Sequence, residues 1–218
     1  MLKLTIESLR KEAAAFSTAE SHRVEKTLFG ITDGKAIGTY LEHRFKTHLQ
    51  RSYELEVSSS ASGIDFPNLL VDIKVTNIHQ PQSSCPFKSA RQKIYGLGYS
   101  LLVFVYEKTD NVNAQTASLK ILHTIFVNAD RTADFQITRG ILQILANEGN
   151  RDDIIAFLLD KNLPADEMEV NQIADEVLNK PPKQGYLTIS NALQWRLQYS
   201  RVIEQAGQVE GIYRINYQ

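Results

Sequence analysis

One almost uninterrupted apolar segment constrains the fold of this chain more than any other feature. Residues Tyr99 to Tyr106 are nearly all apolar, and they are rich in valine and aromatic side chains. Such a run predicts a central β-strand that is buried on both faces. A strand of this kind needs other elements packed against each face, so we expect helices on the flanks of a sheet.

The segments around this strand supply those elements. Apolar residues recur every four positions at Ile37, Leu41, Phe45 and Leu49, which is the stripe of a helix. The order of elements predicts an α/β fold with a mixed central β-sheet flanked by helices. The expected helices are 1–30, 35–49 and 88–97, the expected strands are 53–57, 69–76, 99–106 and 119–127, and 77–87 is expected to be a loop.

The sequence changes character after Asp130. Helical patterns predominate, and the pair Pro181-Pro182 interrupts them. We expect a catalytic core over residues 1–130 and a mainly helical C-terminal region over 131–218. Its element order resembles a winged helix. The expected helices are 137–146, 152–159, 166–178 and a long one over 190–206, followed by a strand-like tail over 209–217.

Net charge, cysteine content and the length of apolar runs limit where the protein acts and what it binds. The formal net charge is −1, so any nucleic-acid binding must come from local basic patches. The single cysteine, Cys85, indicates a reducing compartment. The first residues do not form a signal peptide, and no apolar run is long enough to span a membrane. We expect a cytoplasmic protein that binds no membrane and, lacking a Gly-rich phosphate loop, no nucleotide cofactor.

A short acidic motif carries the chemistry. Side chains alternate between the two faces of a strand, so Asp72 and Lys74 point the same way, opposite the apolar Val71 and Ile73. Asp65 lies seven residues earlier, before a Phe-Pro-Asn turn that can return it beside Asp72. The pattern predicts two carboxylates and one ammonium group on the same face of the sheet.

These groups suit metal-dependent hydrolysis of a phosphodiester bond. Mg²⁺ is a hard ion that prefers oxygen ligands such as Asp65, Asp72 and the backbone carbonyl of Ile73. The ion polarises the phosphate and activates a bound water, and Mn²⁺ is expected to substitute for it. Lys74 can orient that water or stabilise the developing charge.

A third acid fits the same site. Glu42 lies at the edge of the apolar helical stripe, where a buried carboxylate costs free energy unless it has a partner. A metal ion or its water shell would supply that partner. Asp33-Gly34-Lys35 also matches the Asp-x-Lys pattern but sits in a turn. The alternative for Asp72 and Lys74 is an ordinary exposed ion pair on a half-solvated sheet.

At these residues the chain resembles the PD-(D/E)xK nuclease superfamily, which holds most type II restriction enzymes. The sequence around Asp65 most resembles the branch that holds the mismatch-repair nickase and its restriction-enzyme relatives. It departs from that branch in two ways: the proline follows Phe66 instead of preceding Asp65, and the second acid is Asp72 instead of glutamate. The resemblance implies a restriction-endonuclease-like core in which Asp65 and Asp72 bind Mg²⁺. It further implies that Lys74 assists hydrolysis and that Glu42 contributes to the metal site.

Two segments offer candidate contacts to DNA. Cationic and amide side chains after the acidic strand are expected to hold phosphates. A second set on the expected C-terminal helix matches the side chains that read base edges in the major groove. A solvated helix face is the alternative for both sets. The candidates are Lys88, Arg91, Gln92 and Lys93 in the first set and Asn191, Gln194, Gln198 and Arg201 in the second.

Three functions follow from these features. The leading hypothesis is an Mg²⁺-dependent, sequence-specific endonuclease acting on double-stranded DNA, expected to act as a homodimer because palindromic sites have two-fold symmetry. The second is a non-catalytic DNA-binding module with a winged-helix C-terminus. The third is a repair or recombination nuclease that recognises DNA structure instead of sequence.

Overall fold

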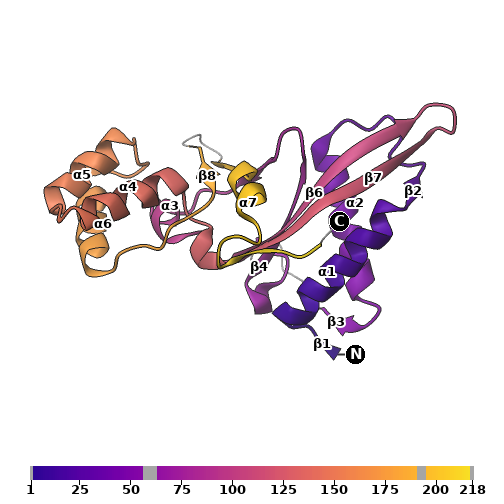
Figure 1. Ribbon diagram of the computed structural model, residues 1–218, viewed down its shortest axis with the longest axis horizontal. Helices are drawn as coiled ribbons and strands as arrows, with labels where there is room; N and C mark the ends of the chain where they lie inside the picture. The colour runs from indigo at the N-terminus through magenta and orange to yellow at the C-terminus, as the bar shows by residue number, and fades with distance from the viewer. Residues whose placement is uncertain (1, 56–62, 191–194, 217–218) are drawn as a thin grey trace. The chain divides into compact units, whose positions relative to one another are not determined.

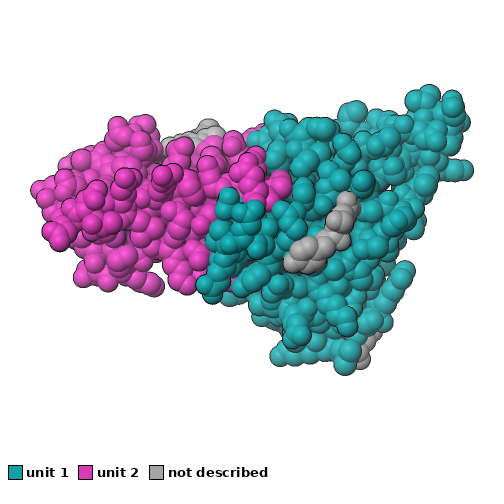
Figure 2. Space-filling view, in the orientation of Figure 1, with its two compact units in different colours: residues 1–82, 101–127, 205–218 teal, residues 83–100, 128–204 magenta. Residues whose placement is uncertain are grey.

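The computed structural model describes residues 2–55, 63–190 and 195–216 (Figure 1). The chain divides into two compact units (Figure 2). Unit 1 holds residues 1–82, 101–127 and 205–218, and unit 2 holds residues 83–100 and 128–204. The expected boundary at residue 130 lies close to Val127, where the chain crosses from unit 1 to unit 2. The chain also crosses between the units after residues 82, 100 and 204, and these crossings were not expected from the sequence.

A twisted sheet forms the centre of unit 1. Its order is β10-β7-β6-β4, and β2 also pairs with β7. The strands β6 and β7 run antiparallel along their whole length and form a long hairpin. The buried strand predicted from Tyr99–Tyr106 is confirmed, since Leu101 to Tyr106 are all buried in β6. The strands are β2 (Val24–Glu25), β4 (Val71–Asn77), β6 (Ser100–Asn111), β7 (Thr116–Val127) and β10 (Ile212–Arg214).

Two helices pack against this sheet. The predicted stripe on α2 (Gly34–Leu49) is confirmed, because its four apolar residues are buried. The ring of Phe45 lies 5.1 Å from that of Phe16 on α1 (Ile6–Ser21) and 5.2 Å from that of Phe104 on β6. The core is therefore shared by both helices and the sheet, as the mixed α/β prediction requires. A short parallel pair, β1 (Leu2–Lys3) with β3 (Tyr53–Glu54), lies beside it.

Unit 2 contains most of the helices after residue 90, together with a small sheet. Three of the four helices predicted for the C-terminal region are confirmed, as α4 (Phe135–Ala146), α5 (Arg151–Asp160) and α6 (Glu167–Asn179). Their N-caps are Asp134, Asn150 and Asp166, whose side chains accept hydrogen bonds from free backbone N–H groups of the first turn. The sheet has the order β5-β9-β8, with β5 (Gln82–Cys85), β8 (Thr188–Ile189) and β9 (Trp195–Gln198).

The prediction of one long helix over 190–206 is wrong. Strand β9 and the short helix α7 (Ser200–Gln205) occupy its described part. Trp195, Leu197 and Tyr199 are buried and alternate with exposed Arg196 and Gln198. This two-residue period is that of a strand, and burying the three large side chains in unit 2 outweighs the weaker helical spacing of the leucines.

The tail expected over 209–217 does not supply the β-ribbon of a winged helix. The tail strand β10 pairs antiparallel with β7 of the main sheet, with Ile212 opposite Val127, and so forms no wing in unit 2. The helix expected over 88–97 is only α3 (Gln92–Tyr95), which ends at Gly96 with a φ of 94°. The expected loop over 77–87 includes β5. No helix in the described residues is long and apolar enough to cross a membrane.

Candidate active site

The turn before β4 places Asp65 beside the strand. Phe66 and Val71 pair as an antiparallel bridge, with each backbone N–H donating to the other residue's carbonyl. The residues between them form the 3-10 turn η1 (Pro67–Leu69), which ends at Leu70 with a left-handed φ of 51°. This tight reversal brings the chain back on itself, so Asp65 returns alongside β4 as predicted.

Strand β4 separates its apolar and polar side chains as its alternation predicts. Val71 and Ile73 are buried in the core of unit 1. Asp72 and Lys74 share the opposite face, where Lys74 Nζ lies 2.8 Å from Asp72 Oδ2. Asp72 is only 5% exposed, so this pair is not the exposed ion pair of the alternative interpretation.

Asp65 is held by three groups. Its Oδ2 accepts a 2.8 Å hydrogen bond from the backbone N–H of Ile73, and its carboxyl is hydrogen-bonded to that of Asp72. Its Oδ1 accepts a 2.5 Å hydrogen bond from Lys46 Nζ. The two aspartates therefore meet at one point between β4 and the preceding turn.

Lys46 was missed by the sequence prediction. It lies on α2 one helical turn after Glu42, so the two side chains project from the same face of that helix. The four-residue spacing from Glu42 is a signal that could have identified it. The site thus has two lysines: Lys74 beside Asp72, and Lys46 beside Asp65.

Burial and mutual repulsion perturb the acids. Burial, together with the negative charge of Asp65, raises the pKa of Glu42 to about 7. Burial and the hydrogen bond with Asp65 also raise the pKa of Asp72 to about 6, despite the neighbouring Lys74. Burial opposes ionisation of Asp65 too, but its hydrogen bonds with Asp72, Lys46 and Ile73 leave its pKa below the ordinary value. Several shifted pKa values close together are typical of functional sites.

The acids suit a hard divalent cation by their chemistry. Asp65 and Asp72 offer only oxygen donors, and a cation would relieve the repulsion that raises the pKa of Asp72. Across residues 2–55, 63–190 and 195–216, however, no group of three or more His, Cys, Asp or Glu side chains is placed to hold a metal ion. Glu42 acts on the two aspartates electrostatically but does not complete a three-carboxylate cluster with them.

Comparison with known proteins identifies the family. The family model for the type II restriction enzyme NspV matches residues 3–214. The type II restriction enzyme NspV of a Nostoc species is 67% identical over 215 residues, covering 99% of this chain and 98% of that protein. The chain belongs to the NspV family of type II restriction enzymes. Among solved structures, the tetrameric restriction endonuclease SfiI bound to cognate DNA matches with a TM-score of 0.44 and 10% identity, over 97% of this chain and 82% of that one.

Membership of the NspV family decides between the three functional hypotheses. A type II restriction enzyme is an endodeoxyribonuclease that cuts DNA at a defined sequence, so the chain is a sequence-specific DNA endonuclease. The non-catalytic module and the structure-specific repair nuclease are thereby set aside. Enzymes of this type generally use divalent metal ions, which agrees with the oxygen-only chemistry of the two aspartates.

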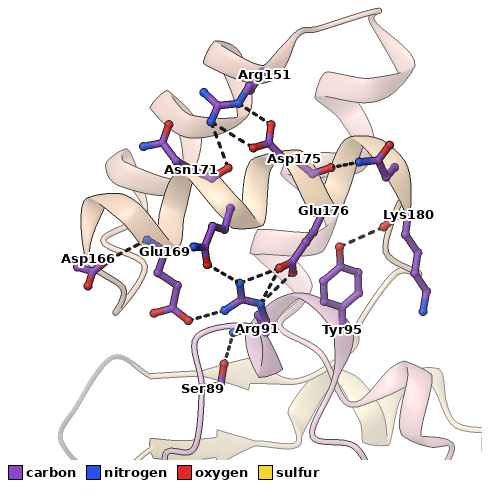
Figure 3. Close-up of polar contacts among 12 residues, drawn as sticks. Ser89, Arg91, Tyr95, Arg151, Asp166, Glu169, Asn171, Asp175, Glu176 and Lys180 are labelled. Carbon is purple, nitrogen blue, oxygen red and sulfur yellow. Dashed lines mark hydrogen bonds and ion pairs between the residues drawn. The ribbon is translucent and has the colours of Figure 1, made fainter.

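Arg91, a predicted DNA contact of this NspV relative, lies in an acidic surrounding (Figure 3). Its guanidinium forms ion pairs of 2.7 Å with both Glu169 and Glu176 on α6. The two glutamates, seven residues apart, lie two turns apart along one side of that helix. The charge of Arg91 is therefore balanced by acidic side chains within unit 2.

The other predicted DNA contacts differ in how exposed their side chains are. Lys93 is only 3% exposed and lies over the ring of Trp195. The side chain of Gln92 bonds to the backbone of Lys88 and Leu97, and Lys88 itself is exposed. Gln198 is exposed on β9, and Arg201 lies on α7. Asn191 and Gln194 fall outside the described residues.

Proposed function

We propose that this endonuclease hydrolyses phosphodiester bonds with Mg²⁺ at a centre formed by Glu42, Asp65, Asp72 and Lys74. One observation carries the proposal: Asp65 and Asp72 are hydrogen-bonded to each other while Lys74 contacts Asp72 from the same strand face. A pair of buried acids beside an ammonium group is costly as a purely structural arrangement. It is productive when a metal ion and a phosphate share the site.

The two aspartates would hold the ion. Asp65 and Asp72, with the backbone carbonyl of Ile73, are the proposed ligands, and Mn²⁺ is expected to replace Mg²⁺. When bound, the ion supplies a polarised phosphate and an activated water. Glu42 does not complete a three-carboxylate cluster with the two aspartates among the described residues, so its proposed contribution is through the water shell of the metal.

Lys74 has a separate task. Its ammonium group already contacts Asp72, so it stands beside the position where negative charge develops on the phosphate. We assign it the stabilisation of that charge and the orientation of the attacking water. Such a donor contributes about 10²–10³-fold to the rate in other hydrolytic enzymes.

The substrate is proposed to be double-stranded DNA cut by a homodimer. Two-fold symmetry in the protein would match a palindromic recognition sequence. Of the predicted contacts, exposed Lys88 and Gln198 and half-buried Arg201 remain available for DNA, whereas Arg91 and Lys93 are engaged within unit 2. Sedimentation of the protein alone and with duplex DNA tests the stoichiometry.

Cleavage of unmethylated phage DNA tests the catalytic proposal. The purified protein is incubated with Mg²⁺, with Mn²⁺ or with EDTA, next to the variant Asp72→Asn. Discrete fragments that require the ion and disappear in the variant support the assignment. Cleavage by Asp72→Asn at the wild-type rate would show that the metal centre lies elsewhere in the chain.

A further inference from the structure

Two arginines share one aromatic ring in unit 2. The guanidinium carbon of Arg201 lies 3.8 Å from the ring centroid of Phe135, and that of Arg139 lies 5.8 Å from it. Arg139 is on α4 and Arg201 is on α7, so the fold brings them together from distant parts of the chain. Neither takes part in an ion pair with another described residue.

This arrangement keeps two positive charges close together without neutralising them. A cation–π contact holds a guanidinium by its face and leaves N–H donors at its edge for another partner. The arginines around α6 differ in this respect, because Arg91 and Arg151 both form ion pairs with acidic side chains (Figure 3). The contrast within one unit indicates that an anion from outside the chain complements the charges at Phe135.

The surface around the two arginines extends onto the small sheet of unit 2. Arg201 Nη1 donates a 3.1 Å hydrogen bond to Thr188 Oγ1 on β8. Thr188 lies directly opposite Gln198 on β9, and directly opposed residues of antiparallel strands share a face. Gln198 and Arg196 are two residues apart and both exposed, so Arg196 lies on that face as well.

We propose that the face formed by Phe135, Arg139, Thr188, Arg196, Gln198 and Arg201 contacts duplex DNA. Arg139 and Arg201 bind backbone phosphates, and β9 presents Arg196 and Gln198 to base edges. Arginine and glutamine are the side chains that make paired hydrogen bonds to guanine and adenine, and strands as well as helices can present them. The proposal deepens the proposed function, because it rests on duplex DNA being the substrate.

The phosphate contacts are tested by salt dependence. Binding of the non-cleaving variant Asp72→Asn to an arbitrary duplex is measured in EDTA over a range of salt concentrations. Adding Arg139→Gln and Arg201→Gln together is expected to weaken binding and to reduce the slope of log K against log [salt] by about 1.8. The matched control Arg151→Gln removes an arginine that is already paired with Asp175, so it leaves the slope unchanged.

A second variant separates charge from folding. Arg201→Lys keeps the charge, so it is expected to retain the wild-type slope, and thermal unfolding confirms that each variant is folded. An unchanged slope in the folded double glutamine variant overturns the phosphate assignment. Because EDTA removes cleavage from the measurement, this result is readable even if the wild-type protein cuts no DNA.

The base contacts are tested by selection. Asp72→Asn is used to enrich sequences from a pool of random duplexes, alone and with Arg196→Gln and Gln198→Ala. The unaltered face is expected to enrich one sequence, and the altered face is expected to lose about tenfold or more of that preference while binding the pool equally well. Enrichment of the same sequence to the same extent by both proteins overturns the assignment of β9.

Discussion

Lys46 donates a 2.5 Å hydrogen bond to Asp65 Oδ1, placing an ammonium group on a carboxylate proposed to bind the metal ion. The lysine comes from α2, whereas the aspartate precedes β4, so the contact joins two elements of unit 1. Without a metal ion, this contact offsets the negative charge of a buried acid. A cation that binds Asp65 must compete with it.

Lys46→Met is therefore expected to bind divalent ions more tightly. The substitution removes both the competing donor and a repulsive positive charge, for a gain of roughly two- to tenfold in affinity. Calorimetric titration of the DNA-free protein with Mn²⁺ measures it directly. Lys46→Arg, which keeps the charge, should behave like the wild type. Equal or weaker binding by the methionine variant would contradict this role.

Lys74 and Lys35 provide a matched pair for testing the catalytic motif. Both follow an Asp-x-Lys pattern, but Asp33 caps α2 through the backbone N–H groups of Lys35 and Ala36 instead of lying on a strand. Lys74→Ala is expected to lower the single-turnover cleavage rate by about 100-fold or more. Lys35→Ala is expected to leave that rate unchanged. Comparable losses in both variants would remove the distinction between the two motifs.

The parts of the fold that sequence predicted are those set by local patterns. The stripe on α2 and the alternation in β4 each reflect which side of one element faces the core. The Asp65 turn is likewise contained within a few residues. These features need no knowledge of the rest of the chain, so the local pattern is enough to place Asp65, Asp72 and Lys74 together.

The features that sequence did not predict depend on distant residues. Arg91 resembled a free cation because its partners Glu169 and Glu176 lie 78 and 85 residues away. The sequence around β9 has Leu193 and Leu197 at helical spacing, but the burial of Trp195 and Leu197 decides that residues 195–198 form a strand. The tail belongs to the main sheet because β7 offers an edge for it, which no local pattern reveals.

Asp134 is expected to be a stability determinant of unit 2. Its Oδ1 accepts from the N–H of Ile137 and caps α4, while its Oδ2 accepts from the N–H of Ile189 on β8. The residue is 4% exposed, so Asp134→Ala leaves two buried donors without partners. The cost is about 2–4 kcal/mol in urea unfolding. Asp166→Ala, which removes an exposed cap from α6, should cost only about 1 kcal/mol.

Glu42 is expected to lower the free energy of unfolding of the metal-free protein at neutral pH. Its pKa is about 7 in the folded state against 4.5 as the ordinary value, so the folded state holds a proton that the unfolded state releases. Stability is therefore lost as the pH rises from 4.5 to 7 and levels off above 7. Glu42→Gln removes this loss, because the amide carries no charge at any pH.

In EDTA at pH 8, Glu42→Gln should be more stable than the wild type by on the order of 1–3 kcal/mol. At pH 4 the two proteins should be equally stable, because Glu42 is then largely protonated in both states. Urea unfolding at the two pH values measures the difference, and cleavage should fall in the same variant. A stabilised variant with reduced activity would show that Glu42 is retained for the reaction at a cost to the fold. A destabilised one at pH 8 would instead assign Glu42 a structural role.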